Sequence, residues 1–143
     1  MSRPNICVDL DGVVSSWDDG TFFDIGPVLP QAKGFLARLS KIGNVIIWTC
    51  RTTSSMYDNE RARVLAGQIW SWLRKNGLAD YVTEVWAGQG KPYAACYIDD
   101  KAIYCDPEKN GTLDYDLALA AASKMRDSSK AHINKDRNNA RLR

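Results

Sequence analysis

The chain has 143 residues, enough for one domain with a buried core. Its apolar content of 45% and charged content of 25% are ordinary for a globular protein, and no stretch predicts a membrane span or a signal peptide. The formal charge of +2 is unevenly distributed, because residues 127–143 carry a net +3 and residues 1–126 a net −1. We therefore expect a nearly neutral folded domain over 1–126 and a flexible basic tail over 127–143.

The four cysteines show no CxxC spacing, and three of them lie in or beside apolar, strand-like runs. They are Cys7, Cys50, Cys96 and Cys105. This usage predicts reduced core residues in a cytoplasmic protein, not a disulfide framework or a zinc site.

Near the start, an apolar run leads directly into two acidic residues. Residues 6–8 predict a strand of a parallel sheet covered by helices, followed by Asp9, Asp11 and the turn-forming Gly12. Open α/β sheets bind ligands at the carboxyl ends of their strands. If the strand continues, Asp9 and Asp11 share a face, and two such carboxylates favour a hard cation such as Mg²⁺. Taken alone, Asp-Gly also fits a hairpin turn.

Residues 15–26 predict a short hairpin or flap, because the turn signal of residues 18–20 lies between aromatic residues. This flap would hang over the carboxyl end of the first strand. Two interpretations of Trp17 stay open: it touches a substrate, or it packs the flap onto the body.

Two helices and two strands follow in alternation. A helix is predicted from Pro30 to Gly43, with an apolar stripe formed by Phe35, Leu36, Leu39 and Ile42. A buried strand over 44–49 then ends in the polar residues Thr49, Cys50 and Arg51. A second helix is predicted from an Asp58 cap to Gly77, with a stripe formed by Leu65, Ile69, Trp72 and Leu73. Strand, helix and strand in this order form a right-handed βαβ unit.

The rest of the chain predicts shorter elements. A third strand is expected over 81–86, and a glycine-rich loop then carries Lys91. A fourth strand over 95–100 ends in Asp99 and Asp100, a brief fifth strand is expected over 103–105, and a helix over 113–125.

Carboxylate and hydroxyl residues therefore follow strands one, two and four, a lysine precedes strand four, and parallel strands bring such residues to one edge of the sheet. They are Asp9, Asp11, Thr49, Lys91, Asp99 and Asp100. Phosphoryl transfer to a carboxylate needs a nucleophile, a proton donor, hydroxyl and cationic groups for the phosphoryl oxygens, and a hard metal ion. This set of residues contains all of the protein groups.

Over residues 5–105 the chain resembles the haloacid dehalogenase (HAD) superfamily of aspartyl phosphatases. Asp9-Leu10-Asp11-Gly12, Thr49, Lys91 and Asp99-Asp100 look like its motifs I to IV, and residues 90–103 resemble small, capless members of the capsule-biosynthesis and phage-encoded types. The resemblance implies an α/β, Rossmann-like three-layer fold with a mostly parallel sheet ordered 3-2-1-4-5. It also implies a short flap without a separate cap domain.

The resemblance also implies roles for individual residues. Asp9 would be the nucleophile and Asp11 the general acid and base. The expected phosphate-binding residues are Thr49, Cys50, Arg51 and Lys91, of which Cys50 has no role of its own and Arg51 either contacts the substrate anion or caps a loop. Magnesium would be bound by the Asp9 carboxylate, the Asp11 carbonyl oxygen and Asp100, with Asp99 in the outer shell.

The sequence thus predicts a Mg²⁺-dependent phosphomonoesterase with an open site. Its partner would be a small phosphorylated substrate, such as a nucleotide or a sugar phosphate, or a nucleic-acid end, with no membrane partner. A homo-oligomer in which another subunit covers the site stays open. The basic tail either binds nucleic acid or only aids solubility. The alternatives are a non-catalytic binding or regulatory protein on the same scaffold, and a receiver-type phosphoacceptor domain.

Overall fold

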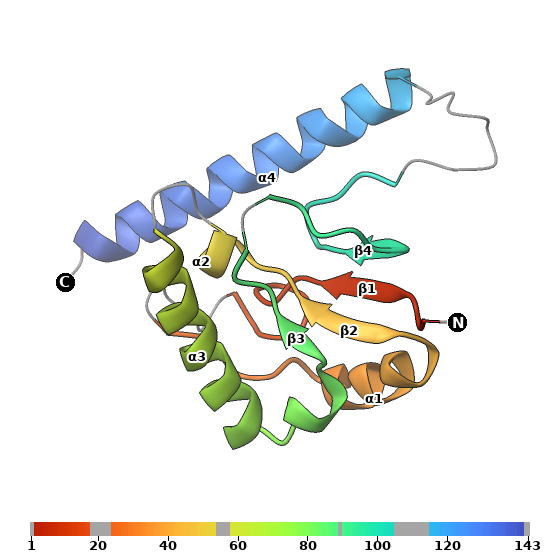
Figure 1. Cartoon of the computed structure of the whole chain (residues 1–143). Helices are drawn as coiled ribbons and strands as arrows, with labels where there is room; N and C mark the ends of the chain where they lie inside the picture. The colour runs from red at the N-terminus through yellow and green to blue at the C-terminus, as the bar shows by residue number, and fades with distance from the viewer. Residues whose placement is uncertain (1, 18–23, 54–57, 89, 105–114, 142–143) are drawn as a thin grey trace. The chain divides into compact units, whose positions relative to one another are not determined.

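A four-stranded, all-parallel sheet forms the centre of the first part of the chain (Figure 1). The computed structural model describes residues 2–17, 24–53, 58–88, 90–104 and 115–141. The strand order is β3-β2-β1-β4. The strands are Asn5–Val8 (β1), Asn44–Ile47 (β2), Glu84–Val85 (β3) and Cys96–Ile98 (β4). The predicted α/β class with a parallel sheet is confirmed.

The sheet has fewer and shorter strands than the sequence predicts. The predicted fifth strand is not formed by Ile103 or Tyr104, and Cys105 lies outside the described residues. The first strand ends at Val8, and two residues later the Leu10 carbonyl oxygen accepts turn hydrogen bonds from Val14 and Ser15 instead of continuing a ladder. The strand alternation that would place Asp9 and Asp11 on one face therefore does not apply.

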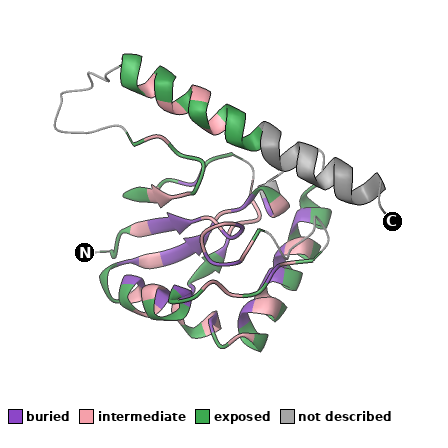
Figure 2. Ribbon diagram, turned by 180° about the vertical axis from the view of Figure 1, so that it is seen from behind, coloured by how far each residue is buried: buried purple, intermediate pink, exposed green. Residues whose placement is uncertain are grey.

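The two longer helices of this part, α1 (Ala32–Ile42) and α3 (Asn59–Lys75), share one core with the sheet. The shorter ones are α2 (Cys50–Thr53) and the 3₁₀ helix η1 (Ala79–Tyr81). One buried cluster joins Leu36 of α1 and Leu73 of α3 to Val8 and Ile47 of the central strands (Figure 2). Val8 and Ile47 are register partners on adjacent strands, so their side chains lie on the same face of the sheet, and α1 and α3 cover that face.

The connection from β3 to β4 supplies no helix for a further layer. Its described residues, 86–88 and 90–95, form neither helix nor strand. Cys7 and Ile46, which alternate to the other face of the sheet, are nevertheless buried.

The first helix ends before Gly43 as predicted, but it starts later than predicted. It starts at Ala32 instead of Pro30, and Gln31 precedes it with a left-handed backbone (φ 68°). Leu36 and Leu39 are buried as predicted, but Ile42 is 67% exposed.

The second predicted helix is capped as expected. The Asp58 side chain accepts the backbone N–H of Arg61 at 2.8 Å. Ile69 and Leu73 are buried, together with two alanines that the predicted stripe omitted, Ala62 and Ala66. Leu65 and Trp72, also predicted for the stripe, are only partly buried. Small side chains thus bring α3 close to its neighbours.

The core prediction for the cysteines is correct only for Cys7 among those described. Cys7 is buried in β1, whereas Cys50 on α2 and Cys96 at the start of β4 are exposed, and all three are free thiols. Cys96 is exposed because β4 is the edge strand. Cys105 lies outside the described residues.

The chain divides into two compact units, residues 1–100 and 101–143. The second unit contains the helix α4 (Tyr115–Arg141). The predicted helix end at residue 125 is therefore wrong. Alanine, lysine and arginine favour helix even where no apolar residues pack. A prediction based on the spacing of apolar residues therefore ends the helix too early.

Among the described residues, no helix is both long enough and apolar enough to cross a lipid bilayer.

Candidate functional site

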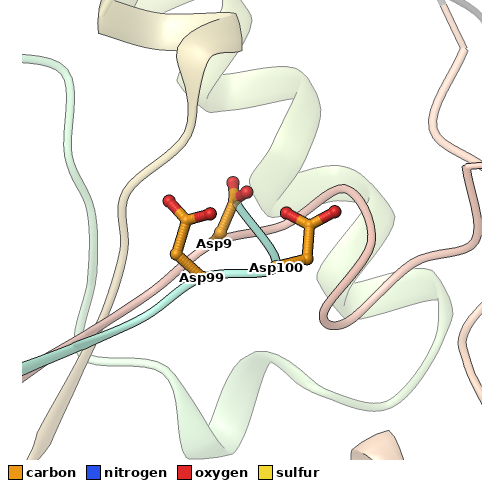
Figure 3. A group of neighbouring side chains, drawn as sticks. All are labelled: Asp9, Asp99 and Asp100. Atoms are coloured by element: carbon orange, nitrogen blue, oxygen red, sulfur yellow. The ribbon is translucent and has the colours of Figure 1, made fainter. Parts of the chain in front are cut away.

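Three carboxylates meet where β1 and β4 end. Beyond the strands, the Asp9 N–H donates to the Ile98 carbonyl oxygen at 2.9 Å, which continues the ladder and brings Asp9 beside Asp99. One carboxylate oxygen each of Asp9, Asp99 and Asp100 lie within 4.8 Å of one another. Figure 3 shows the three side chains pointing to the same side of the strand ends. We call these residues the Asp triad.

The Asp triad is electrostatically unfavourable for the ionised form of Asp9. Burial, as the largest cause, together with the negative charges of Asp99, Asp100 and Asp11 raises the pKa of Asp9 to about 7. The hydrogen bond from the Leu10 N–H to Asp9 Oδ1, at 2.8 Å, opposes this rise. A cation bound among the three side chains would favour the ionised form.

The donor atoms of the Asp triad determine which cation fits. All three side chains offer oxygen, and carboxylate oxygens suit hard ions such as Mg²⁺ better than soft ones. The triad therefore fits the predicted magnesium. A carboxylate oxygen of Asp99 lies within the same 4.8 Å limit as that of Asp100, although the resemblance implied an outer-shell place for Asp99.

Asp11 lies two residues from Asp9, and its carboxylate has a different partner. Arg51 Nε donates to Asp11 Oδ2 at 2.7 Å and Arg51 Nη2 donates to Oδ1 at 2.8 Å, a bidentate pair. The two side chains are only 7% and 13% exposed for Asp11 and Arg51, respectively. Ser15 Oγ also donates to Asp11 Oδ1, at 3.5 Å. Asp11 is thus a buried, cation-paired carboxylate.

The segment after β2 brings Arg51 into position. Thr49 is buried, and its Oγ1 accepts the backbone N–H of Arg51 at 3.3 Å at the start of α2. Thr52 Oγ1 donates to the Trp86 carbonyl oxygen at 2.6 Å, which ties α2 to the segment after β3. The exposed Cys50 lies between these anchoring residues. Of this segment, Arg51 reaches Asp11.

Lys91 has aromatic neighbours. Its Nζ lies 4.0 Å from the centre of the Tyr97 ring and 6.0 Å from that of the Trp48 ring. These two rings meet edge to face, with centres 5.4 Å apart. Cation–π contacts of this kind hold an ammonium group weakly enough for it to exchange partners.

The flap also contributes to the site. Ser15 bridges to Asp11 and to Val28, so the described ends of the flap pair with each other. The Trp17 indole N–H donates to Asp100 Oδ2 at 3.1 Å. The predicted turn at residues 18–20 lies outside the described residues.

The structure brings the predicted residues into two groups. Asp9, Asp99 and Asp100 form one group; Asp11, Arg51 and Thr49 form the other. The sequence did not reveal the partners of Asp11 and Asp100, because Arg51 and Trp17 are distant from them in the chain. In the sequence, the place of Trp17 in the predicted flap was the signal that it could lie near the site.

The chain was compared with protein-family models, with curated proteins and with solved structures, and none of the three comparisons found a match.

Proposed function

We propose that this protein is a Mg²⁺-dependent phosphomonoesterase that works through an aspartyl-phosphate on Asp9. The observation that carries the proposal is the Asp triad: three carboxylates from two adjacent parallel strands within 4.8 Å of one another. Strand ends of an open parallel sheet are where α/β enzymes bind their ligands. The order of the motifs along the chain, with its resemblance to HAD phosphatases, supplies the reaction type.

In the proposed first step, an oxygen of the Asp9 carboxylate attacks phosphorus, and the bond from phosphorus to the ester oxygen breaks. The leaving oxygen takes a proton from Asp11. In the second step Asp11 accepts a proton from water while the water oxygen attacks phosphorus, which releases phosphate and restores Asp9. Magnesium held by Asp9, Asp99, Asp100 and the Asp11 carbonyl oxygen would offset the negative charge of the phosphoryl group.

The Asp11–Arg51 pair sets a condition on this scheme. Both guanidinium contacts, at 2.7 and 2.8 Å, engage the carboxylate that must carry the proton. A substrate phosphoryl group competes for the same guanidinium, since arginine binds carboxylate and phosphate in the same bidentate manner. Binding of substrate would therefore transfer Arg51 from Asp11 to the phosphoryl group and release Asp11 for proton transfer.

The remaining phosphate contacts follow the same logic. Thr49 would donate its hydroxyl to a phosphoryl oxygen. Lys91 would exchange its contact with the Tyr97 ring for the phosphoryl charge. Its present partners are uncharged, so this exchange breaks no ion pair among the described contacts of Lys91.

The proposal includes a Rossmann-like, capless scaffold. The link between β3 and β4 is short, and the segment of residues 12–29, which contains the flap, is too small for an independent domain. An open site of this kind accepts a nucleotide, a sugar phosphate or the phosphorylated end of a nucleic acid.

The test is phosphate release from a panel of phosphomonoesters by the full chain, with Mg²⁺ or with a chelator. The panel contains an aryl phosphate, deoxynucleotides, sugar phosphates and a 3′-phosphorylated oligonucleotide. The variant is Asp9→Asn, and the matched control is Asp80→Asn, an exposed aspartate in η1.

We expect Mg²⁺-dependent release from at least one substrate by the wild type and by Asp80→Asn, and no detectable release by Asp9→Asn. Release that survives in Asp9→Asn would refute the nucleophile. Folded wild type that binds Mg²⁺ but releases phosphate from no substrate would favour a non-catalytic binding protein.

A further inference from the structure

Trp17 makes an unusual contact for a half-exposed aromatic residue. Its side chain is 47% exposed, yet its indole N–H is directed at Oδ2 of Asp100, at 3.1 Å. This hydrogen bond links the flap to the Asp triad, although Trp17 and Asp100 lie far apart in the sequence.

The Trp17–Asp100 contact lies directly against the backbone of Gly12 in the turn after β1. A Cβ on Gly12 would lie 2.3 Å from Asp100 Oδ2 and 2.6 Å from both Cδ1 and Nε1 of Trp17. Gly12 also has φ +87°, a conformation that favours glycine. A side chain at position 12 would therefore displace the Trp17 ring or the Asp100 carboxylate from this contact.

The hydrogen bond from Trp17 can orient the Asp100 carboxylate for cation binding. A carboxylate has two oxygens, so Asp100 can accept the indole N–H on Oδ2 and bind a cation through Oδ1. Hydrogen bonds from a neighbouring donor fix the orientation of a metal ligand, and their loss typically weakens metal binding about 10- to 100-fold. Burial of the ring does not explain the contact, because nearly half of the side chain remains exposed to solvent.

We propose that Trp17 is a positioning residue of the cation site, whose indole N–H holds the Asp100 carboxylate in the orientation that binds the ion. This inference rests on the proposed function, since it takes the Asp triad as the cation site. It adds that the flap takes part in cation binding: residues 15–17 extend the turn after Gly12 and deliver the donor.

The test compares Trp17→Phe with the wild type by calorimetric titration of Mg²⁺ into the full chain. Phenylalanine keeps an aromatic ring but removes the N–H donor. The matched control is Trp70→Phe, a partly buried tryptophan of α3 that packs against the core. The unfolding temperature of each protein in chelator reports any purely structural effect of the substitution.

We expect Mg²⁺ affinity about 10-fold weaker or more in Trp17→Phe, unchanged affinity in Trp70→Phe, and an unfolding temperature of Trp17→Phe in chelator close to that of the wild type. Equal affinity in Trp17→Phe and wild type would overturn the inference. So would a loss of affinity accompanied by a matching loss of cation-free stability, which indicates packing of the flap. A wild type that binds no Mg²⁺ would refute the cation site itself, an outcome distinct from either of these.

Discussion

Asp9 of the Asp triad and Asp11 are only two residues apart in the chain, but their carboxylates have opposite electrostatic environments. At the Asp triad, three carboxylates approach within 4.8 Å, and burial together with the neighbouring negative charges raises the pKa of Asp9 to about 7. At Asp11, both carboxylate oxygens accept hydrogen bonds from the guanidinium of Arg51. One site concentrates negative charge, and the other neutralises it within the chain.

This difference separates binding from proton transfer. Three converging carboxylates gain most from an external cation, because a bound ion removes their mutual repulsion. A carboxylate already paired with arginine gains little from such an ion, and its side chain is available for a different task once the arginine is given another anion. The two sites thus have the properties required of a cation site with its nucleophile and of a separate acid and base.

Asp11→Asn is the sharpest way to separate the two sites functionally. We expect phosphate release to fall about 10²- to 10⁴-fold, because the amide cannot donate and accept the proton. Mg²⁺ affinity should stay close to that of the wild type, since the carbonyl oxygen of residue 11 is retained. Phosphate release and Mg²⁺ titration on the same preparation measure both quantities; a large loss of Mg²⁺ affinity would place the Asp11 side chain in the cation site.

Arg51→Ala tests the paired site through stability. Removing one partner of a buried ion pair leaves the other charge uncompensated, so we expect the free energy of unfolding at pH 7 to fall by about 3–5 kcal/mol. Denaturant unfolding of the full chain measures this change.

The matched control for Arg51→Ala is Arg126→Ala. Arg126 pairs with Asp127 at 3.1 Å, but both side chains are more than 60% exposed. Exposed pairs contribute only about 0–1 kcal/mol. Similar losses in the two variants would show that the Asp11–Arg51 pair behaves as a surface pair.

The pH dependence of stability tests the Asp triad. The pKa of Asp9 is raised in the folded chain from its ordinary value of 3.8 to about 7, so the folded state retains a proton that the unfolded state loses. The free energy of unfolding of the cation-free protein should therefore fall as pH rises from about 4 to about 7. Asp9→Asn should reduce this slope, and Mg²⁺ should restore stability at neutral pH.

Unfolding curves in chelator at several pH values, repeated with Mg²⁺, measure this effect. It is the smallest of the three, because Asp9 is partly exposed and water screens its charge. A slope that is the same in Asp9→Asn and wild type would assign the pH dependence to other groups.

The sequence predicted the parts of the fold that depend on regular patterns. Apolar runs located the four strands, and the strand–helix alternation predicted their parallel pairing, whereas the expected strand order came from the resemblance to the HAD superfamily. The cap at Asp58 followed from its side-chain chemistry. The extent of α4 was missed, because the predicted boundary relied on apolar spacing, which a helix rich in charged residues and alanine does not show.

The candidate site was predicted in composition but not in its pairing. Asp9, Asp99 and Asp100 follow strands that turned out to be adjacent, so strand order was sufficient to bring them together. The side-chain partners of Asp11 and Asp100 depend on the path of the turn after Leu10 and on the start of α2. Neither path has a periodic signal, so the contacts of Arg51 and Trp17 became visible only in the structure.

The most direct test of the account is to trap the phosphoryl group on Asp9. The full chain would be quenched during turnover of its best substrate with Mg²⁺ and reduced with borohydride, which converts an acyl phosphate into an alcohol. Peptide mass spectrometry then locates the modified residue. We expect homoserine at position 9, dependent on substrate and on Mg²⁺, and an unmodified Asp11. Modification at a different aspartate during turnover would contradict it.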